Sequence, residues 1–152
     1  MIATCIDSSA LLRFVFEEGY VSLVHSALAG SPVAATLAAV EVPAAIHARR
    51  HRGLFTADRR DHFLVVATHL LDRLALIGLD SSVRRDAVRA CEPILLRALD
   101  AIHVATAIAI ARRRRRLGVE IRFCTADRRQ AEAAALLLGA SRVDLLPRLP
   151  AS

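Results

Sequence analysis

The stretch that decides the fold is IATCIDSSALLRFVFE, residues 2–17. Residues 2–6 form a short apolar run of the kind that makes a buried strand. Directly after it, the apolar positions recur every three or four residues, which predicts a helix over 8–17 that starts at Ser8 or Ser9. A buried strand followed at once by a helix is the building unit of an α/β protein.

The same alternation continues along the chain. The further strands that we predict lie at 33–35, 120–124 and 143–146, and 74–78 fits either a strand or the end of a helix. The further predicted helices lie at 21–29, 37–52, 57–72, 83–91, 100–116 and 127–139. Strands separated by helices predict a mainly parallel sheet that is covered on both faces, which is a three-layer α/β/α sandwich.

Some helix ends have local signals. Thr36 can cap the helix over 37–52, and Pro43 should kink its first turns or move its start downstream. Asp80, Ser81 or Ser82 caps the helix over 83–91, and Gly118 and Gly139 end the last two helices.

Length and composition limit the class of protein. A chain of 152 residues suits one compact domain over residues 1–152, and its 55% apolar content excludes a disordered chain. No apolar run reaches the roughly 18 residues that a membrane-spanning helix needs. Asp7 interrupts the only candidate signal segment, so we expect a cytoplasmic protein without membrane contact. Three widely spaced cysteines predict free thiols.

Every basic side chain other than histidine is arginine, and the net charge is +6. The guanidinium group grips phosphate with two parallel hydrogen bonds, so nucleic acid is an expected partner, although charge alone does not separate RNA from DNA or from an acidic protein.

Four acidic residues stand in apolar surroundings or where a helix should begin: Asp7, Glu41, Asp100 and Asp127. A carboxylate among apolar neighbours is costly unless it is paired, hydrogen-bonded or bound to a cation. Asp7 and Asp127 follow two predicted strands, and the carboxyl ends of parallel strands share one edge of a sheet. Helix N-termini should also keep these carboxylates ionised. The alternative for Asp7, Asp100 and Asp127, taken singly, is a helix N-cap.

An all-oxygen cluster suits Mg²⁺ or Mn²⁺ rather than zinc. Such cations activate water and neutralise charge on phosphoryl oxygens during an in-line displacement, which indicates phosphodiester hydrolysis.

Four segments resemble one known family: IDSSALL (6–12), VEVPAA (40–45), LRALDAIHVATA (96–107) and FCTADRRQAEAAALLLG (123–139). In this order and spacing they are similar to the PIN-domain family, specifically the VapC-type toxins of bacterial toxin–antitoxin pairs. The resemblance spans nearly the whole chain, and it implies a single PIN-like nuclease domain.

The resemblance implies a Mg²⁺- or Mn²⁺-dependent endoribonuclease, the toxin component of a VapBC-type module. Its catalytic and metal-binding residues would be Asp7, Glu41, Asp100 and Asp127, with accessory hydroxyls at Ser8 or Ser9 and at Thr125. A homodimer and a small antitoxin that covers the acidic pocket are implied as well. Some relatives carry a further acid where this chain has Arg128, Arg129 and Gln130, so one-ion and two-ion mechanisms both stay open.

Several basic residues are candidates for contact with RNA. Arg112 and Arg113 belong to a run of five arginines, for which a solvated helix end is the simpler interpretation. Arg49 and Arg50 follow Glu41 closely, and Arg128 follows Asp127. His103, one helical turn after Asp100, could orient that carboxylate or act as a general acid, or simply pack in the core.

Two other functions compete with the nuclease. One is a catalytically inactive PIN-like subunit that binds or regulates another protein and uses its acids as helix caps. The other is a phosphomonoesterase with Asp7 as a covalent nucleophile, which Ser9 disfavours because a second acid is expected at that position.

Overall fold

The computed structural model describes residues 2–17 and 21–147, and within them a five-stranded sheet forms the centre. The strands are β1 (Ile2–Ile6), β2 (Val33–Ala35), β3 (Ala75–Ile77), β4 (Glu120–Thr125) and β5 (Val143–Leu145). Their order is β3-β2-β1-β4-β5, and every neighbouring pair is parallel. The predicted parallel sheet is confirmed, and the ambiguous stretch 74–78 contains a strand.

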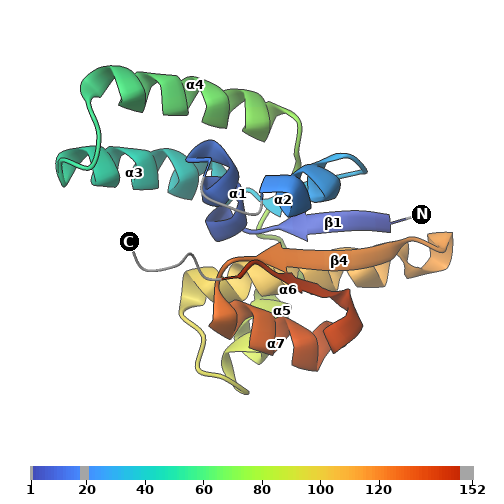
Figure 1. The fold of residues 1–152 in the computed structure, drawn as a ribbon. Helices are drawn as coiled ribbons and strands as arrows, with labels where there is room; N and C mark the ends of the chain where they lie inside the picture. The colour runs from blue at the N-terminus through green and yellow to red at the C-terminus, as the bar shows by residue number, and fades with distance from the viewer. Residues whose placement is uncertain (1, 18–20, 148–152) are drawn as a thin grey trace.

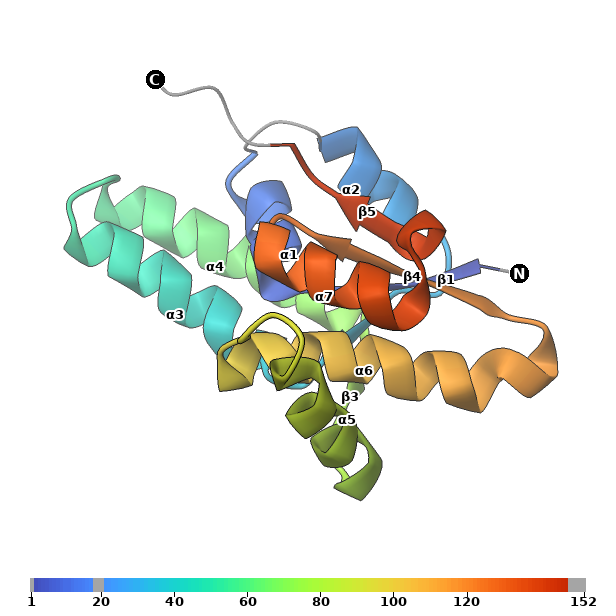
Figure 2. The ribbon, with the colours of Figure 1, turned by 90° about the horizontal axis from the view of Figure 1, so that it is seen from below.

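Seven α-helices in the described part of the chain cover the two faces of this sheet (Figures 1 and 2). On one face lie α1 (Ser8–Val15), α2 (Val21–Leu28), α3 (Ala38–His51) and α4 (Ala57–Asp72). On the other lie α5 (Ser81–Cys91), α6 (Ala98–Arg114) and α7 (Arg128–Leu138). The predicted three-layer α/β/α arrangement is therefore confirmed. Two short 3₁₀ helices, η1 (Arg115–Leu117) and η2 (Ala140–Arg142), follow α6 and α7.

The strands contribute to two cores because their side chains alternate between the faces. Ile6 and Cys124 pack with α1 to α4, whereas Cys5 and Phe123 pack with α5 to α7. Both faces are covered, so the central strands are apolar along their length, as their sequence indicated. The three thiols are free, and two of them, Cys5 and Cys124, are buried.

Helix α1 begins at Ser8, as predicted, and Asp7 is its N-cap, which was the alternative considered for this residue. Two other expectations about helix starts differ from the structure. Thr36 does not cap α3: its backbone N–H continues the sheet by donating to Ile77, and Leu37 takes the N-cap position without a side-chain bond. Pro43 does not move the start of α3 downstream, because the helix begins at Ala38.

The start of α6 is also earlier than predicted. The helix begins at Ala98 with Arg97 as N-cap, so Asp100 is its third residue and not a cap. Asp80 caps α5 by accepting from the N–H groups of Ser82 and Val83, as expected. Gly118 ends η1 in the left-handed region with φ 64°, where glycine has no steric penalty.

The sheet order makes β1 and β4 neighbours at the point where the chain changes its direction of winding. Chain segments after β1 build one half of the sheet, and those after β4 build the other. In open parallel sheets, ligands bind beyond the carboxyl ends of the strands at such a point. None of the helices in the described residues combines the length and apolar character needed to span a bilayer.

Two valines that flank Glu41 provide a matched test of this packing. Val42 is fully buried in the core beneath α3, whereas Val40 is 66% exposed on the same helix. We expect Val42→Ala to lower the free energy of unfolding by about 2 kcal/mol through lost burial and a residual cavity. Val40→Ala should change it by less than about 0.5 kcal/mol. Urea unfolding of both variants measures the difference, and equal losses would contradict the assignment of the buried face.

Candidate active site

Asp7 lies at the centre of the candidate site, directly after β1, and is 1% exposed. Its backbone N–H donates to the carbonyl of Cys124 at 3.1 Å, which joins the ends of β1 and β4. Its carboxylate accepts from the backbone N–H of Ala10 at 2.9 Å and from Thr125 Oγ1 at 2.8 Å. The hydroxyl of Ser9 donates to the same carboxylate, 2.8 and 2.9 Å from its two oxygens.

The two hydroxyls that bind Asp7 also fix the end of β4. Ser9 Oγ accepts from the backbone N–H of Ala126 at 2.8 Å, and Thr125 Oγ1 accepts from that of Asp127 at 2.9 Å. The chain leaving β4 is thus bound to the chain leaving β1 through side chains as well as backbone. The hydroxyls predicted as accessory groups lie beside the acids, with Ser9 and Thr125 on Asp7.

Asp127 and Asp100 are connected by Gln130. Asp127 caps α7 by accepting from the backbone N–H of Gln130 at 3.0 Å. The side-chain amide of Gln130 donates to Asp100 Oδ1 at 3.2 Å. Gln130 is 4% exposed, and its Oε1 atom has no hydrogen-bond partner among the described residues. A buried, unpaired carbonyl oxygen therefore lies in the same side chain that links the two acids.

Glu41 forms the other side of the site with Ser8 and His103. Glu41 Oε2 accepts from Ser8 Oγ at 2.5 Å and from His103 Nε2 at 2.7 Å. His103 is 2% exposed and lies one turn after Asp100 on α6, yet its hydrogen bond goes to Glu41. His103 is therefore placed to orient Glu41. The sequence had suggested Asp100 as its partner.

The structure brings all four predicted acids to the carboxyl ends of β1 and β4. They are close enough to influence one another electrostatically: Asp127 and Glu41 both act on Asp100, and Asp7 and Asp100 both act on His103. No group of three or more His, Cys, Asp or Glu side chains in residues 2–17 and 21–147 is arranged to hold a metal ion.

Two of the four acids have raised pKa values, and for Asp7 this opposes the expectation that a helix N-terminus keeps its carboxylate ionised. Burial raises the pKa of Asp7, although the charge of His103 and the bonds from Ala10, Ser9 and Thr125 oppose the shift. Burial also raises the pKa of Asp100, and repulsion from Asp127 and Glu41 adds to it. For both residues, desolvation outweighs the helix terminus, so a bound cation would relieve an unfavourable charge.

Glu41 and His103 behave as an ion pair. Burial alone would lower the pKa of His103, but the hydrogen bond to Glu41 and the charges of Asp7, Glu41 and Asp100 raise it above its ordinary value. Burial would raise the pKa of Glu41, but the bonds from His103 and Ser8 lower it. Both residues are therefore charged at pH values between the lowered pKa of Glu41 and the raised pKa of His103.

The predicted RNA-binding arginines lie in three different places. Arg49 stacks over the Phe16 ring at 4.0 Å, and Arg50 lines a cavity of about 630 Å³ with His47, His51 and Arg60. Arg128 pairs with Glu132 at 3.0 Å on the first turn of α7.

Arg112 and Arg113 are not brought to the acids. They pair with Asp86 and Asp80 of the α5 segment, and twelve residues of α6, about 18 Å along its axis, separate Arg112 from Asp100.

Gln130 is the site residue that the sequence did not reveal. The spacing Asp127-x-x-Gln130 is that of a capping box, in which the glutamine would bond to the cap residue of its own helix. Here the amide reaches Asp100 on α6 instead.

Compared with protein-family models and with curated proteins, the chain gives no match. The geometry of the site therefore provides the basis for a functional proposal.

The Glu41–His103 pair predicts a pH-dependent stability. A histidine with a raised pKa stabilises the fold fully below its ordinary value of 6.5, and the contribution is lost as the pH rises through the raised value. Glu41, whose pKa is lowered, contributes above its ordinary 4.5 and loses this as the pH falls through the lowered value. We expect Glu41→Gln to cost about 1 to 2 kcal/mol near pH 6 and clearly less at pH 9.

Urea unfolding at the two pH values measures this difference. The matched control is Glu132→Gln, which removes an exposed carboxylate paired with Arg128 and should cost little at either pH. An equal loss for Glu41→Gln at both pH values would show that the imidazolium charge does not contribute.

Proposed function

We propose that the protein is a divalent-metal-dependent endoribonuclease with a PIN-like domain, the toxin component of a VapBC-type toxin–antitoxin module. The observation that carries this proposal is the convergence of Asp7, Glu41, Asp100 and Asp127 from four distant segments at the carboxyl ends of β1 and β4.

The chemistry of the site fits a hard cation such as Mg²⁺ or Mn²⁺. All four acids offer oxygen ligands, which these cations prefer. Burial raises the pKa of Asp7 and Asp100, so both carboxylates lack a full counter-charge. Gln130 Oε1 adds a buried oxygen without a partner. When bound, the cation would supply Lewis acidity that activates water and neutralises charge on the phosphodiester.

The surrounding side chains have the task of orienting the four acids. Ser9, Thr125 and the N–H of Ala10 fix both oxygens of Asp7. The amide of Gln130 holds Asp100. His103 keeps its proton at Nε2 and thereby keeps Glu41 ionised. Because these donors come from α1, α6, α7 and the end of β4, the acids are positioned by the packing of the whole domain.

RNA is the substrate that the charge of the chain supports. All cationic groups other than histidines are arginines, which suit phosphate contacts. The cavity lined by His47, Arg50, His51 and Arg60 lies on α3 and α4, and α3 also carries Glu41. We infer that the RNA backbone reaches the acids along this helix. A homodimer and a small antitoxin remain part of the proposal through the family resemblance alone.

A catalytically inactive, protein-binding subunit is the second candidate. The observation that favours it is that Asp7 and Asp127 both cap helices, and hydrogen bonds already use the oxygens of Asp7. In that case the acids would serve stability alone.

The variant Asp7→Asn separates the two candidates. Asparagine also caps helices, so α1 should be kept. We expect RNA cleavage with Mg²⁺ or Mn²⁺ to fall at least about a hundredfold. The metal-free variant should unfold at equal or higher urea concentration than the parent, because a costly buried charge has been removed. The same metal ions should stabilise the parent protein and not the variant.

The control is Asp58→Asn, a charge change of equal size at an exposed residue in the first turn of α4. It should leave cleavage and metal-dependent stability unchanged. If antitoxin-free protein yields no chelator-sensitive RNA products, and Asp7→Asn lowers stability with no change in metal response, the inactive subunit is the better description.

The toxin role has its own test. Expression of the parent protein should stop cell growth, Asp7→Asn should not, and co-expression of a short polypeptide encoded next to the gene should relieve the arrest. Cleavage without any growth effect would leave a nuclease and remove the toxin label.

A further inference from the structure

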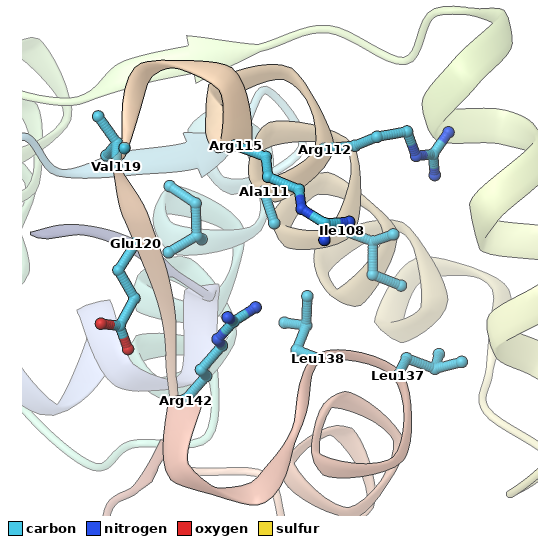
Figure 3. A pocket seen from close by; sticks show the side chains of 11 residues that line it. Ile108, Ala111, Arg112, Arg115, Val119, Glu120, Leu137, Leu138 and Arg142 are labelled. Atoms are coloured by element: carbon cyan, nitrogen blue, oxygen red, sulfur yellow. The ribbon is translucent and has the colours of Figure 1, made fainter.

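A second cavity, of about 560 Å³, lies near the amino-terminal end of β4, whereas the acids lie at the carboxyl ends of β1 and β4 (Figure 3). It is bounded by the last turns of α6 and α7, by η1 and by the start of β4. Apolar side chains form part of its wall, namely Ile108, Ala111, Val119, Ile121, Leu137 and Leu138. A cavity of this size that combines apolar side chains with a few polar groups is typical of sites for small organic ligands.

Two arginines reach over this wall. Arg115 comes from η1 and Arg142 from η2, and Figure 3 shows both guanidinium groups directed into the cavity. Neither guanidinium group has a hydrogen bond or a carboxylate partner in the described part of the chain. Two like charges that share one cavity repel each other, so an anion between them would be stabilised.

The other charged residues of the cavity do not neutralise this pair. Arg112 points away from the cavity in Figure 3 and binds Asp86 at 2.5 Å. Glu120 lines the cavity as well, but its carboxylate lies on the other side of the β4 ribbon from the two guanidinium groups in that view. Among the described residues, neither Glu120 nor Asp86 forms an ion pair with Arg115 or Arg142.

Helix ends explain only part of this arrangement. The negative ends of the α6 and α7 dipoles favour cations nearby. That effect accounts for exposed arginines such as these. It does not require two guanidinium groups from separate segments to point into one cavity (Figure 3).

We propose that this cavity binds a small organic anion with an apolar body and a phosphate or carboxylate head. The body would lie against Ile108, Leu137 and Leu138, and the head between Arg115 and Arg142. A nucleic acid strand fits less well, since two guanidinium groups beside apolar side chains offer no row of phosphate contacts.

The cavity is separate from the acidic site, although the same two helices reach both. Asp100 and Gln130 stand in the first turns of α6 and α7, whereas the cavity is formed by their last turns. The proposal therefore does not depend on nuclease activity, and a ligand bound here would leave the acids accessible.

Hexyl phosphate is a suitable probe, with inorganic phosphate and hexanol as its separate halves. We expect hexyl phosphate to shift the backbone amide NMR signals of Ile108, Gly118, Leu138 and their neighbours in a saturable way. Each half alone should bind at least about tenfold more weakly, because it makes only the ionic or only the apolar contact.

Charge reversal provides the matched variants. Arg142→Glu should weaken binding of hexyl phosphate by about tenfold or more, whereas Arg116→Glu, the same change at an exposed residue outside the cavity wall, should leave it unchanged. Arg142→Lys, which keeps the charge, should retain most of the affinity. An unchanged amide spectrum of the free variants confirms their fold.

Three results would overturn the proposal. They are tight binding of inorganic phosphate alone, equal loss of affinity in Arg116→Glu and Arg142→Glu, and saturable shifts that lie outside the cavity or do not occur at all.

Discussion

The buried carboxylate of Asp7 imposes the strictest constraint on this structure. An isolated charge that is 1% exposed would cost several kcal/mol, so the fold must supply donors to it. Those donors come from two places: Ser9 and Ala10 at the start of α1, and Thr125 at the end of β4. Thr125 can reach Asp7 only if β4 lies directly beside β1. The hydrogen bonds that Asp7 needs therefore require β1 and β4 to be neighbours in the sheet.

Two of the remaining acids follow the same rule, since each is held by a donor from another element. Glu41 on α3 is bound by His103 on α6, and Asp100 on α6 by Gln130 on α7. Burial raises the pKa of Asp100, and repulsion from Asp127 and Glu41 adds to the shift, so gathering these like charges costs stability. Asp7 and Asp100, whose pKa values are raised, would cost the fold less as neutral groups. The cation of the proposed function would compensate this charge.

The sequence was sufficient for the parts that depend on local periodicity and on one topological rule. Short apolar runs identified the strands, and the shared edge of parallel strands placed Asp7 near Asp127. It was not sufficient where tertiary contacts override a local preference. The spacing of Gln130 from Asp127 is that of a capping box, which favours a bond within its own helix, but the side-chain amide donates to Asp100 on α6. His103 lies one turn from Asp100, yet Glu41, 62 residues away, lies closer to its Nε2.

The parallel sheet also separates charges between the two ends of its strands. Helix N-termini gather at the carboxyl edge with the acids, and the C-termini of α6 and α7 gather at the other with arginines, whose charge the dipoles favour there. The five arginines at 112–116 therefore do not form one continuous basic surface. Arg112 and Arg113 bind α6 to the α5 segment through Asp86 and Asp80, while Arg115 turns to the cavity. A polyanion bound at the acidic edge must therefore find its cations elsewhere, and α3, which carries both Glu41 and Arg50, is the element that offers them.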